Sequence, residues 1–198
     1  MADLYVSKPK DETRNPLRAY ILHPAKVRFG IQEKDEEIIL LLRKHWLTNV
    51  PWLLVFSVLI FAPLVLRIFP LIDFLPVRYQ LMSVIAWYLL LIAFIFEKFL
   101  TWFFNVYIVT DERIIDVDFY NLIYKQVTEA KIDKIQDTTS RVGGVIRSLF
   151  NFGDVLVQTA GAEPNLEFEA VPYPDQVVKI LDELRAQEEK EVLEGRVR

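Results

Sequence analysis

The chain has 198 residues, 53% of them hydrophobic, and a formal net charge of −4 at neutral pH. This length allows one modest water-soluble domain beside any membrane segment, and the acidic balance gives no general attraction to nucleic acid. The sequence contains no cysteine, which excludes disulfides and any catalytic thiol.

The N-terminal segment, residues 1–45, is predicted to be cytoplasmic. Residues 1–22 are polar and mixed in charge, so we expect no cleavable signal sequence, and residues 1–29 have no assignment. Residues 32–45 begin with acidic side chains, continue with five aliphatic residues and end with basic ones. This charge order suits a helix dipole and favours a juxtamembrane helix, but the short apolar run also fits an extra strand of a sheet.

Residues 46–104 are predicted to form a transmembrane hairpin with spans at about 47–67 and 80–100. Residues 47–66 and 80–96 contain no charged side chain, and each run is close to the roughly 20 residues that a helix needs to cross a bilayer. Pro70 and Pro76 interrupt the short connection, so the second helix is expected to return antiparallel to the first.

The flanking residues predict how the hairpin is anchored and oriented. Aromatic side chains that prefer the headgroup region lie near the ends of the runs, and the expected interface anchors are Trp46, Trp52, Tyr79 and Trp102. Basic residues are more frequent before the first apolar run and after the second, at Arg28, Lys34, Arg43, Lys44, Lys98 and Arg113, than in the turn, which has Arg67 and Arg78. The positive-inside rule therefore predicts a multi-pass protein of the inner (cytoplasmic) membrane with both termini in the cytoplasm.

From Asn105 the pattern changes to that of a small β domain, predicted over residues 105–186. Apolar and polar residues alternate on both sides of a tight turn at residues 110–113, and β-branched residues are frequent. Further strands are expected within residues 122–128, 130–138, 155–159 and 166–171, with breaks at Gly143-Gly144 and at residues 161–164.

After Pro174 the periodicity becomes helical. Val177, Ile180, Leu181 and Leu184 share one face, and mostly charged residues occupy the other. We expect this helix to cap the sheet, and we expect the charged tail, residues 187–198, to fray.

Three segments behind the hairpin carry a family resemblance: residues 107–115 (YIVTDERII), 132–137 (IDKIQD) and 151–161 (NFGDVLVQTAG). Their order resembles the bacterial pleckstrin-homology-like family, specifically its membrane-flanked YdbS-like type. The third segment departs from the family pattern, because Asp154 and Val155 follow Gly153 where a second small residue is usual. The resemblance implies a strongly bent antiparallel sheet of seven strands with a capping C-terminal helix, a scaffold used for binding rather than for catalysis.

The residues themselves give no independent indication of an enzyme. His23 and His45 both precede the first span and have no nucleophile in a recognisable pattern with them. Asp116 and Asp118 share a strand face that suits a hard cation, but the sequence offers no evident third ligand, so solvated carboxylates are the simpler interpretation. No cofactor and no metal site is predicted.

The candidate contact residues for a membrane surface or a partner are the basic side chains of the β domain: Lys125, Lys131, Lys134, Arg141 and Arg147. They are interleaved with Glu129, Asp133 and Asp137, so their positive field is partly cancelled. This arrangement argues against a specific headgroup pocket, although Arg141 and Arg147 are placed to touch an inner leaflet that the hairpin keeps close.

Two functions remain open. The first is a non-catalytic, membrane-anchored interaction module that binds a protein partner or the inner-leaflet surface. The second is a structural subunit of a membrane transport or envelope-maintenance complex that contacts its partners through the hairpin. The spans lack a glycine pair at four-residue spacing, which favours lipid-facing helices and therefore the first function. The expected partners are the lipid bilayer and a protein; the formation of homo-oligomers is left open.

Overall fold

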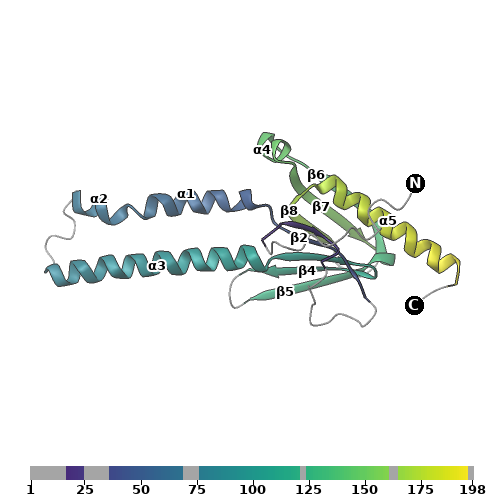
Figure 1. Ribbon diagram of the computed structural model, residues 1–198, viewed down its shortest axis with the longest axis horizontal. Coiled ribbons are helices and arrows are strands. Elements are labelled where there is room, and N and C mark those ends of the chain that lie inside the picture. The colour runs from purple at the N-terminus through teal and green to yellow at the C-terminus, as the bar shows by residue number, and fades with distance from the viewer. Residues whose placement is uncertain (1–16, 25–35, 69–75, 121–123, 161–164, 196–198) are drawn as a thin grey trace.

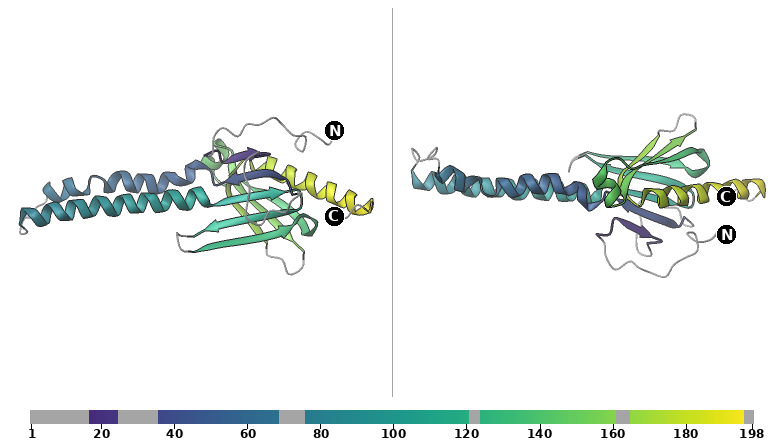
Figure 2. Two further views of the ribbon diagram at one scale, coloured as in Figure 1. Left: turned by 60° about the horizontal axis from the view of Figure 1, so that its bottom comes forward. Right: turned by 90° about the horizontal axis from the view of Figure 1, so that it is seen from above.

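The computed structural model describes residues 17–24, 36–68, 76–120, 124–160 and 165–195. Two antiparallel sheets and a long C-terminal helix form a β domain, and a pair of long helices projects from one end of it (Figures 1 and 2). We call the end of the domain from which the helices project the hairpin end, and the opposite end the far end.

The larger sheet has five strands in sequence order: β1 (Tyr20–Leu22), β2 (Ile38–Arg43), β3 (Val106–Thr110), β4 (Arg113–Phe119) and β5 (Lys125–Lys131). The helical hairpin lies in the chain between β2 and β3, which are neighbours in this sheet. Arg43, the last residue of β2, is opposite Val106, the first residue of β3. The hairpin is therefore inserted into the sheet, where a tight turn would otherwise join two adjacent strands.

The smaller sheet consists of β6 (Ile135–Arg141), β7 (Phe152–Thr159) and β8 (Leu166–Pro172). The short 3₁₀-helix η2 (Ile132–Lys134) connects β5 to β6, and the short helix α4 (Val145–Leu149) lies between β6 and β7. Helix α5 (Pro174–Leu193) covers this sheet and is tied to β6 by two side-chain hydrogen bonds of 2.7 Å, Thr138 to Asp182 and Ser140 to Asp175.

The main core lies between the two sheets and α5. The apolar face of α5 supplies Val177, Ile180, Leu181 and Leu184, as its periodicity predicts. These side chains pack with Leu40 and Leu42 of β2 and with a set from the other strands: Tyr107, Val109, Ile114, Ala130, Val155, Val157, Leu166, Phe168 and Val171. The opposite face of the larger sheet carries a smaller buried cluster of Ile38, Ile108 and Ile115.

The hairpin contains two helical stretches that are long and apolar enough to cross a membrane, Trp46–Val65 and Val77–Phe104. The first combines the 3₁₀-helix η1 (Trp46–Asn49), α1 (Val50–Leu59) and the start of α2 (Ala62–Ile68), and the second is α3 (Val77–Phe104). Almost all of their side chains lie on the outside of the protein; Leu91 is the one residue of α3 that is buried. A soluble protein would bury helices of this composition, so their exposure agrees with the predicted hairpin.

Two aromatic side chains of α3 compensate for a break between α1 and α2. Pro63 has no N–H group, so the carbonyl of Leu59 lacks its usual helical donor. Trp87 donates its indole N–H to that carbonyl at 3.1 Å, and the Tyr88 hydroxyl donates to the neighbouring carbonyl of Ile60 at 3.2 Å. An unpaired carbonyl is most costly where water is absent, so these bonds both permit the break and fix the register of the two helices.

The prediction of a juxtamembrane helix within residues 32–45 is wrong, because residues 38–43 form strand β2 and pair with both β1 and β3. The alternative of an extra strand is confirmed, and the sheet therefore includes residues that precede Asn105. The expected fraying of the tail is also wrong for residues 187–193, since α5 continues to Leu193. The run at 130–138 is divided among β5, η2 and β6. The connection at 69–75, the loop at 161–164 and most of the unassigned residues 1–29 lie outside the described residues.

Candidate functional site

Direct contacts attach both ends of the helical hairpin to the β domain. The Trp102 indole N–H donates to the carbonyl of Lys44 at 2.9 Å, and the Arg43 guanidinium lies 4.5 Å from the centre of the Phe103 ring. On the other side, the backbone N–H of His45 donates to the carbonyl of Ala170 at 2.7 Å. The helices therefore leave the sheet without a flexible linker, and the domain is held at their ends.

Three of the four predicted interface anchors lie at the hairpin end. Trp46 begins η1, Trp52 donates to the Asn49 side chain at 3.0 Å, and Trp102 binds Lys44 as described above. Tyr79 lies near the start of α3, at the opposite end of the hairpin, where the Arg78 guanidinium covers its ring. Aromatic residues thus mark both ends of the apolar region.

The five predicted basic contact residues do not form one cluster. Lys125, Arg141 and Arg147 lie at the hairpin end, whereas Lys131 and Lys134 lie at the far end. Lys125 and Lys131 begin and end the same strand, so they are about 20 Å apart. Arg147 is already paired with Asp154, and Lys134 with Asp133. Exposed pairs of this kind leave little positive field for an anionic ligand.

A buried acidic group lies at the hairpin end, between the sheets. The Asp116 side chain is 7% exposed, and its Oδ1 atom has no hydrogen-bond partner among the described residues. Burial, reinforced by the negative charge of Asp118, raises the pKa of Asp116 to about 7. Lys44 opposes this shift, but Lys44 also forms a 2.6 Å ion pair with Glu169. Asp116 is therefore largely protonated in the folded protein below neutral pH.

This raised pKa predicts an unusual pH dependence of stability. The pKa of Asp116 is 3.8 in the unfolded chain and about 7 in the folded protein. The folded state therefore binds more protons between these values, and stability falls as the pH rises from 4 to 7. Replacing Asp116 with Asn removes the titrating group, so the stability advantage of Asp116→Asn over the natural protein should grow by roughly 1–3 kcal/mol between pH 5 and pH 8. Unfolding monitored by circular dichroism at both pH values measures this; identical pH dependence in the two proteins would contradict it.

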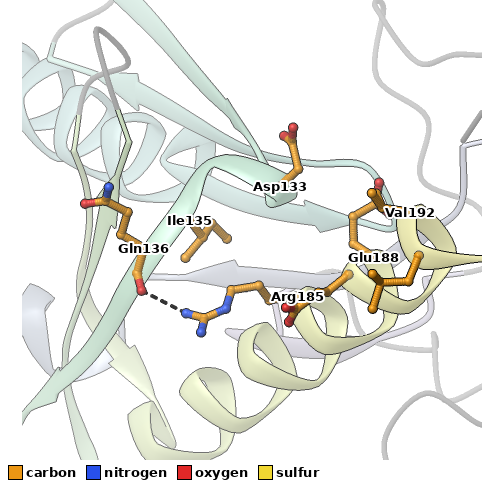
Figure 3. A pocket seen from close by; sticks show the side chains of 8 residues that line it. Asp133, Ile135, Gln136, Arg185, Glu188 and Val192 are labelled. Atoms are coloured by element: carbon orange, nitrogen blue, oxygen red, sulfur yellow. Dashed lines mark hydrogen bonds between the residues drawn. The ribbon is translucent and has the colours of Figure 1, made fainter.

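An open groove of about 470 Å³ lies at the far end, between η2, the start of β6 and the last turns of α5 (Figure 3). Arg185 spans it and donates from Nη1 to the backbone carbonyl of Gln136 at 2.8 Å. The remaining lining is acidic or apolar: Asp133, Glu188 and Glu189, with Ile135, Val192 and Leu193. Asp133 is paired with Lys134, so Glu188 and Glu189 against the Arg185 guanidinium give the groove a negative balance that suits a basic and apolar ligand.

The described residues offer no evident catalytic constellation. Within them, no three His, Asp or Glu side chains are grouped to hold a metal ion. The interpretation of Asp116 as a solvated carboxylate is wrong, because this residue is buried. His45 has a structural role, since its ring stacks on Phe152 with 4.5 Å between centroids and its Nδ1 accepts the backbone N–H of Leu47.

Two structural features of the hairpin and the β domain were not predicted from the sequence. One is the pair Trp87 and Tyr88, for which the signal was Pro63 in the middle of the facing span. The other is the bidentate ion pair between Arg113 and Glu36, both of whose bonds measure 3.0 Å. The two residues of this pair are separated by the whole hairpin, and no local pattern connects them.

Comparison with known proteins agrees with this architecture. The model of one protein family, described as the bacterial PH domain, matches residues 46–185. No curated protein and no solved structure matches the chain. The matched region covers the hairpin, strands β3 to β8 and the start of α5, which is well over half of the sequence. The chain belongs to the bacterial PH domain family.

Proposed function

We propose that this protein is a membrane-anchored, non-catalytic binding module whose PH-like domain lies on the cytoplasmic side of the inner membrane. PH-like domains are in general interaction modules rather than enzymes. The insertion of the apolar hairpin between β2 and β3 carries the proposal, because it joins the anchor to the domain through two adjacent strands of one sheet. A domain attached in this way presents a fixed face to the cytoplasm.

The groove at the far end is the proposed partner site. The elements that line it, η2 and the last turns of α5, lie at the end of the domain opposite the hairpin, so the groove would lie away from the bilayer (Figure 1). Val192 and Leu193 are exposed beside its carboxylates, so it offers both apolar area and negative charge. The ligand with matching chemistry is a protein segment that combines basic and apolar side chains.

Photocrosslinking in intact membranes tests this site. A photoreactive phenylalanine derivative in place of Glu189, inside the groove, should capture a recurrent protein identified by mass spectrometry. The same residue in place of Glu167, an exposed position of β8 outside the groove, is the matched control. Reversing the charge of Glu188 should abolish capture from position 189, because a basic segment would then be repelled.

The possible outcomes separate the candidate functions. Equal capture from positions 189 and 167 would contradict a specific groove. Capture from the outer face of α3, for example from Leu89, without capture from the groove would instead favour a structural subunit that binds through its hairpin. Leu89 is 62% exposed, so its replacement leaves the helix packing unchanged.

A further inference from the structure

A second apolar surface lies outside the hairpin, around the short helix α4. Five large apolar side chains within nine residues are exposed: Val142, Val145, Ile146, Leu149 and Phe150. Val145 is 84% exposed and Leu149 76%. We call this set the α4 surface. A contiguous apolar patch of this kind on a small domain usually marks a contact site.

The α4 surface lies beside the start of the first apolar helix. The rings of Phe150 and Trp46 meet edge to face, with 6.4 Å between their centroids. The residues beside this pair are also in contact, because the ring of His45 stacks on that of Phe152. All three ribbon views place α4 at the hairpin end, at the level where α1 begins (Figures 1 and 2). The α4 surface is therefore continuous with the anchor.

Contacts behind α4 hold it in one orientation. Arg147, on the inner side of the helix, pairs with Asp154 of β7. The other oxygen of Asp154 accepts the backbone N–H of Ala170 at 2.8 Å, which fixes the carboxylate. Gly153 allows β7 to approach the end of β6, because a Cβ at this position would collide with the carbonyl of Arg141. The apolar side chains are thus presented outward by a braced loop.

The charge around α4 differs from that of the whole chain. Residues 141–150 contain two arginines and no carboxylate, although the chain as a whole has a net charge of −4. Because Arg147 is paired with Asp154, the exposed side chain of Arg141 carries the local positive charge. An apolar helix face flanked by arginine is the usual composition of a segment that lies in the headgroup region of an anionic leaflet.

We propose that the α4 surface is seated in the headgroup region of the bilayer that the hairpin crosses. This inference rests on the proposed membrane anchoring. It adds a third point of attachment beside the two helices, which limits how far the domain can tilt and keeps its groove away from the lipid.

Depth-resolved fluorescence of the full chain in lipid nanodiscs tests the inference. Because the chain has no cysteine, single-cysteine variants can carry an environment-sensitive label at one site each. Leu149→Cys reports on the α4 surface. The matched control is Leu193→Cys, which is equally apolar, 81% exposed and located at the far end of the domain. Leu89→Cys, in the middle of α3, reports on the hairpin.

Nanodiscs of phosphatidylcholine and phosphatidylglycerol carry nitroxide quenchers near the headgroup or deep in the acyl region. The label at position 149 should lose roughly half of its emission to the shallow quencher and little to the deep one, as expected for an interfacial helix. The label at position 89 should show the reverse preference, and the label at position 193 should respond to neither quencher.

The failures of the two proposals differ. Quenching at position 89 without quenching at position 149 would overturn the inference and leave the anchor intact. Protection of position 149 from aqueous iodide without lipid quenching would show that protein covers the α4 surface, which also overturns it. Absence of quenching at position 89 would contradict the membrane anchor itself.

Discussion

Removing the hairpin should convert this protein into a folded, water-soluble β domain. Arg43 and Val106 are directly opposite each other on adjacent antiparallel strands. Joining Lys44 to Asn105 through an Asn-Gly turn in place of residues 45–104 therefore preserves the register of the sheet. We expect the shortened protein to remain in the soluble fraction, with a β-rich circular dichroism spectrum and a cooperative thermal transition. An aggregated or unfolded product would contradict the view that the hairpin is an insertion.

A fragment that begins at residue 105 is the matched comparison, because it also lacks the hairpin but loses β2. Leu40 and Leu42 of β2 are both 0% exposed, and their loss leaves large cavities in the main core. Each buried leucine is worth about 2–5 kcal/mol, against a total stability of about 5–15 kcal/mol for a typical domain. The fragment should therefore be unfolded while the Asn-Gly protein is folded. Equal stability of the two would show that β2 is dispensable.

Loss of the Glu36 carboxylate should be among the most destabilising single changes. Its side chain is 0% exposed and binds Arg113 through both oxygens. Removing it with Glu36→Ala deprives the Arg113 guanidinium, which is 15% exposed, of its bidentate partner. The expected cost is about 3–5 kcal/mol, typical of a broken buried ion pair. Thermal unfolding of the full chain in detergent measures it.

Two further variants distinguish the stability contribution of the buried Glu36–Arg113 ion pair from that of an exposed ion pair. Glu129→Ala removes the partner of Arg113 that is 55% exposed, and should cost at most about 1 kcal/mol. Replacing Glu36 and Arg113 together with methionine should recover most of the stability lost in Glu36→Ala, since no charge is left buried without a partner. A double variant as unstable as Glu36→Ala would show that packing, and not the charge, is the cause.

The sequence predicted the parts of this protein that have a local pattern. Two uncharged runs identify the hairpin, and the periodicity around Ile180 identifies the buried face of α5. The segment at 151–161 also has a physical basis, because Gly153 is required by the close approach of the Arg141 carbonyl. In the segment at 107–115, the Thr110 hydroxyl accepts hydrogen bonds from the backbone N–H groups of Glu112 and Arg113 and so closes the turn between β3 and β4.

Strand β2 was ambiguous because both of its faces are buried. Ile39, Leu40 and Leu42 contribute to the main core, and Ile38 contributes to the cluster on the opposite face. A strand buried on both faces has no alternation of apolar and polar residues, so its hydrophobic pattern does not distinguish it from a helix. The partner of β2 lies beyond the hairpin, and no short-range signal indicates that the two strands meet.

The length of α5 was underestimated for a different reason. Residues 188–191 are all charged, which suggested fraying after Ala186, but residues 186–193 contain no glycine or proline and are mostly good helix formers. The helix ends at Leu193, two residues before Gly195, whose positive φ of 69° is the usual conformation after a helix. The last turns of α5 also line the groove, so this error concealed half of the candidate site.

Topology labelling tests the central claim, that two membrane crossings are inserted into a PH-like sheet. In spheroplasts, a membrane-impermeant maleimide should label Arg78→Cys, at the outer end of the hairpin, and should label Glu189→Cys only after permeabilisation. Both positions are exposed in the structure, and the chain has no other cysteine to react. Labelling of position 78 alone in intact spheroplasts is the predicted result. Equal protection of both positions, or equal labelling of both, would show that the hairpin does not cross the membrane.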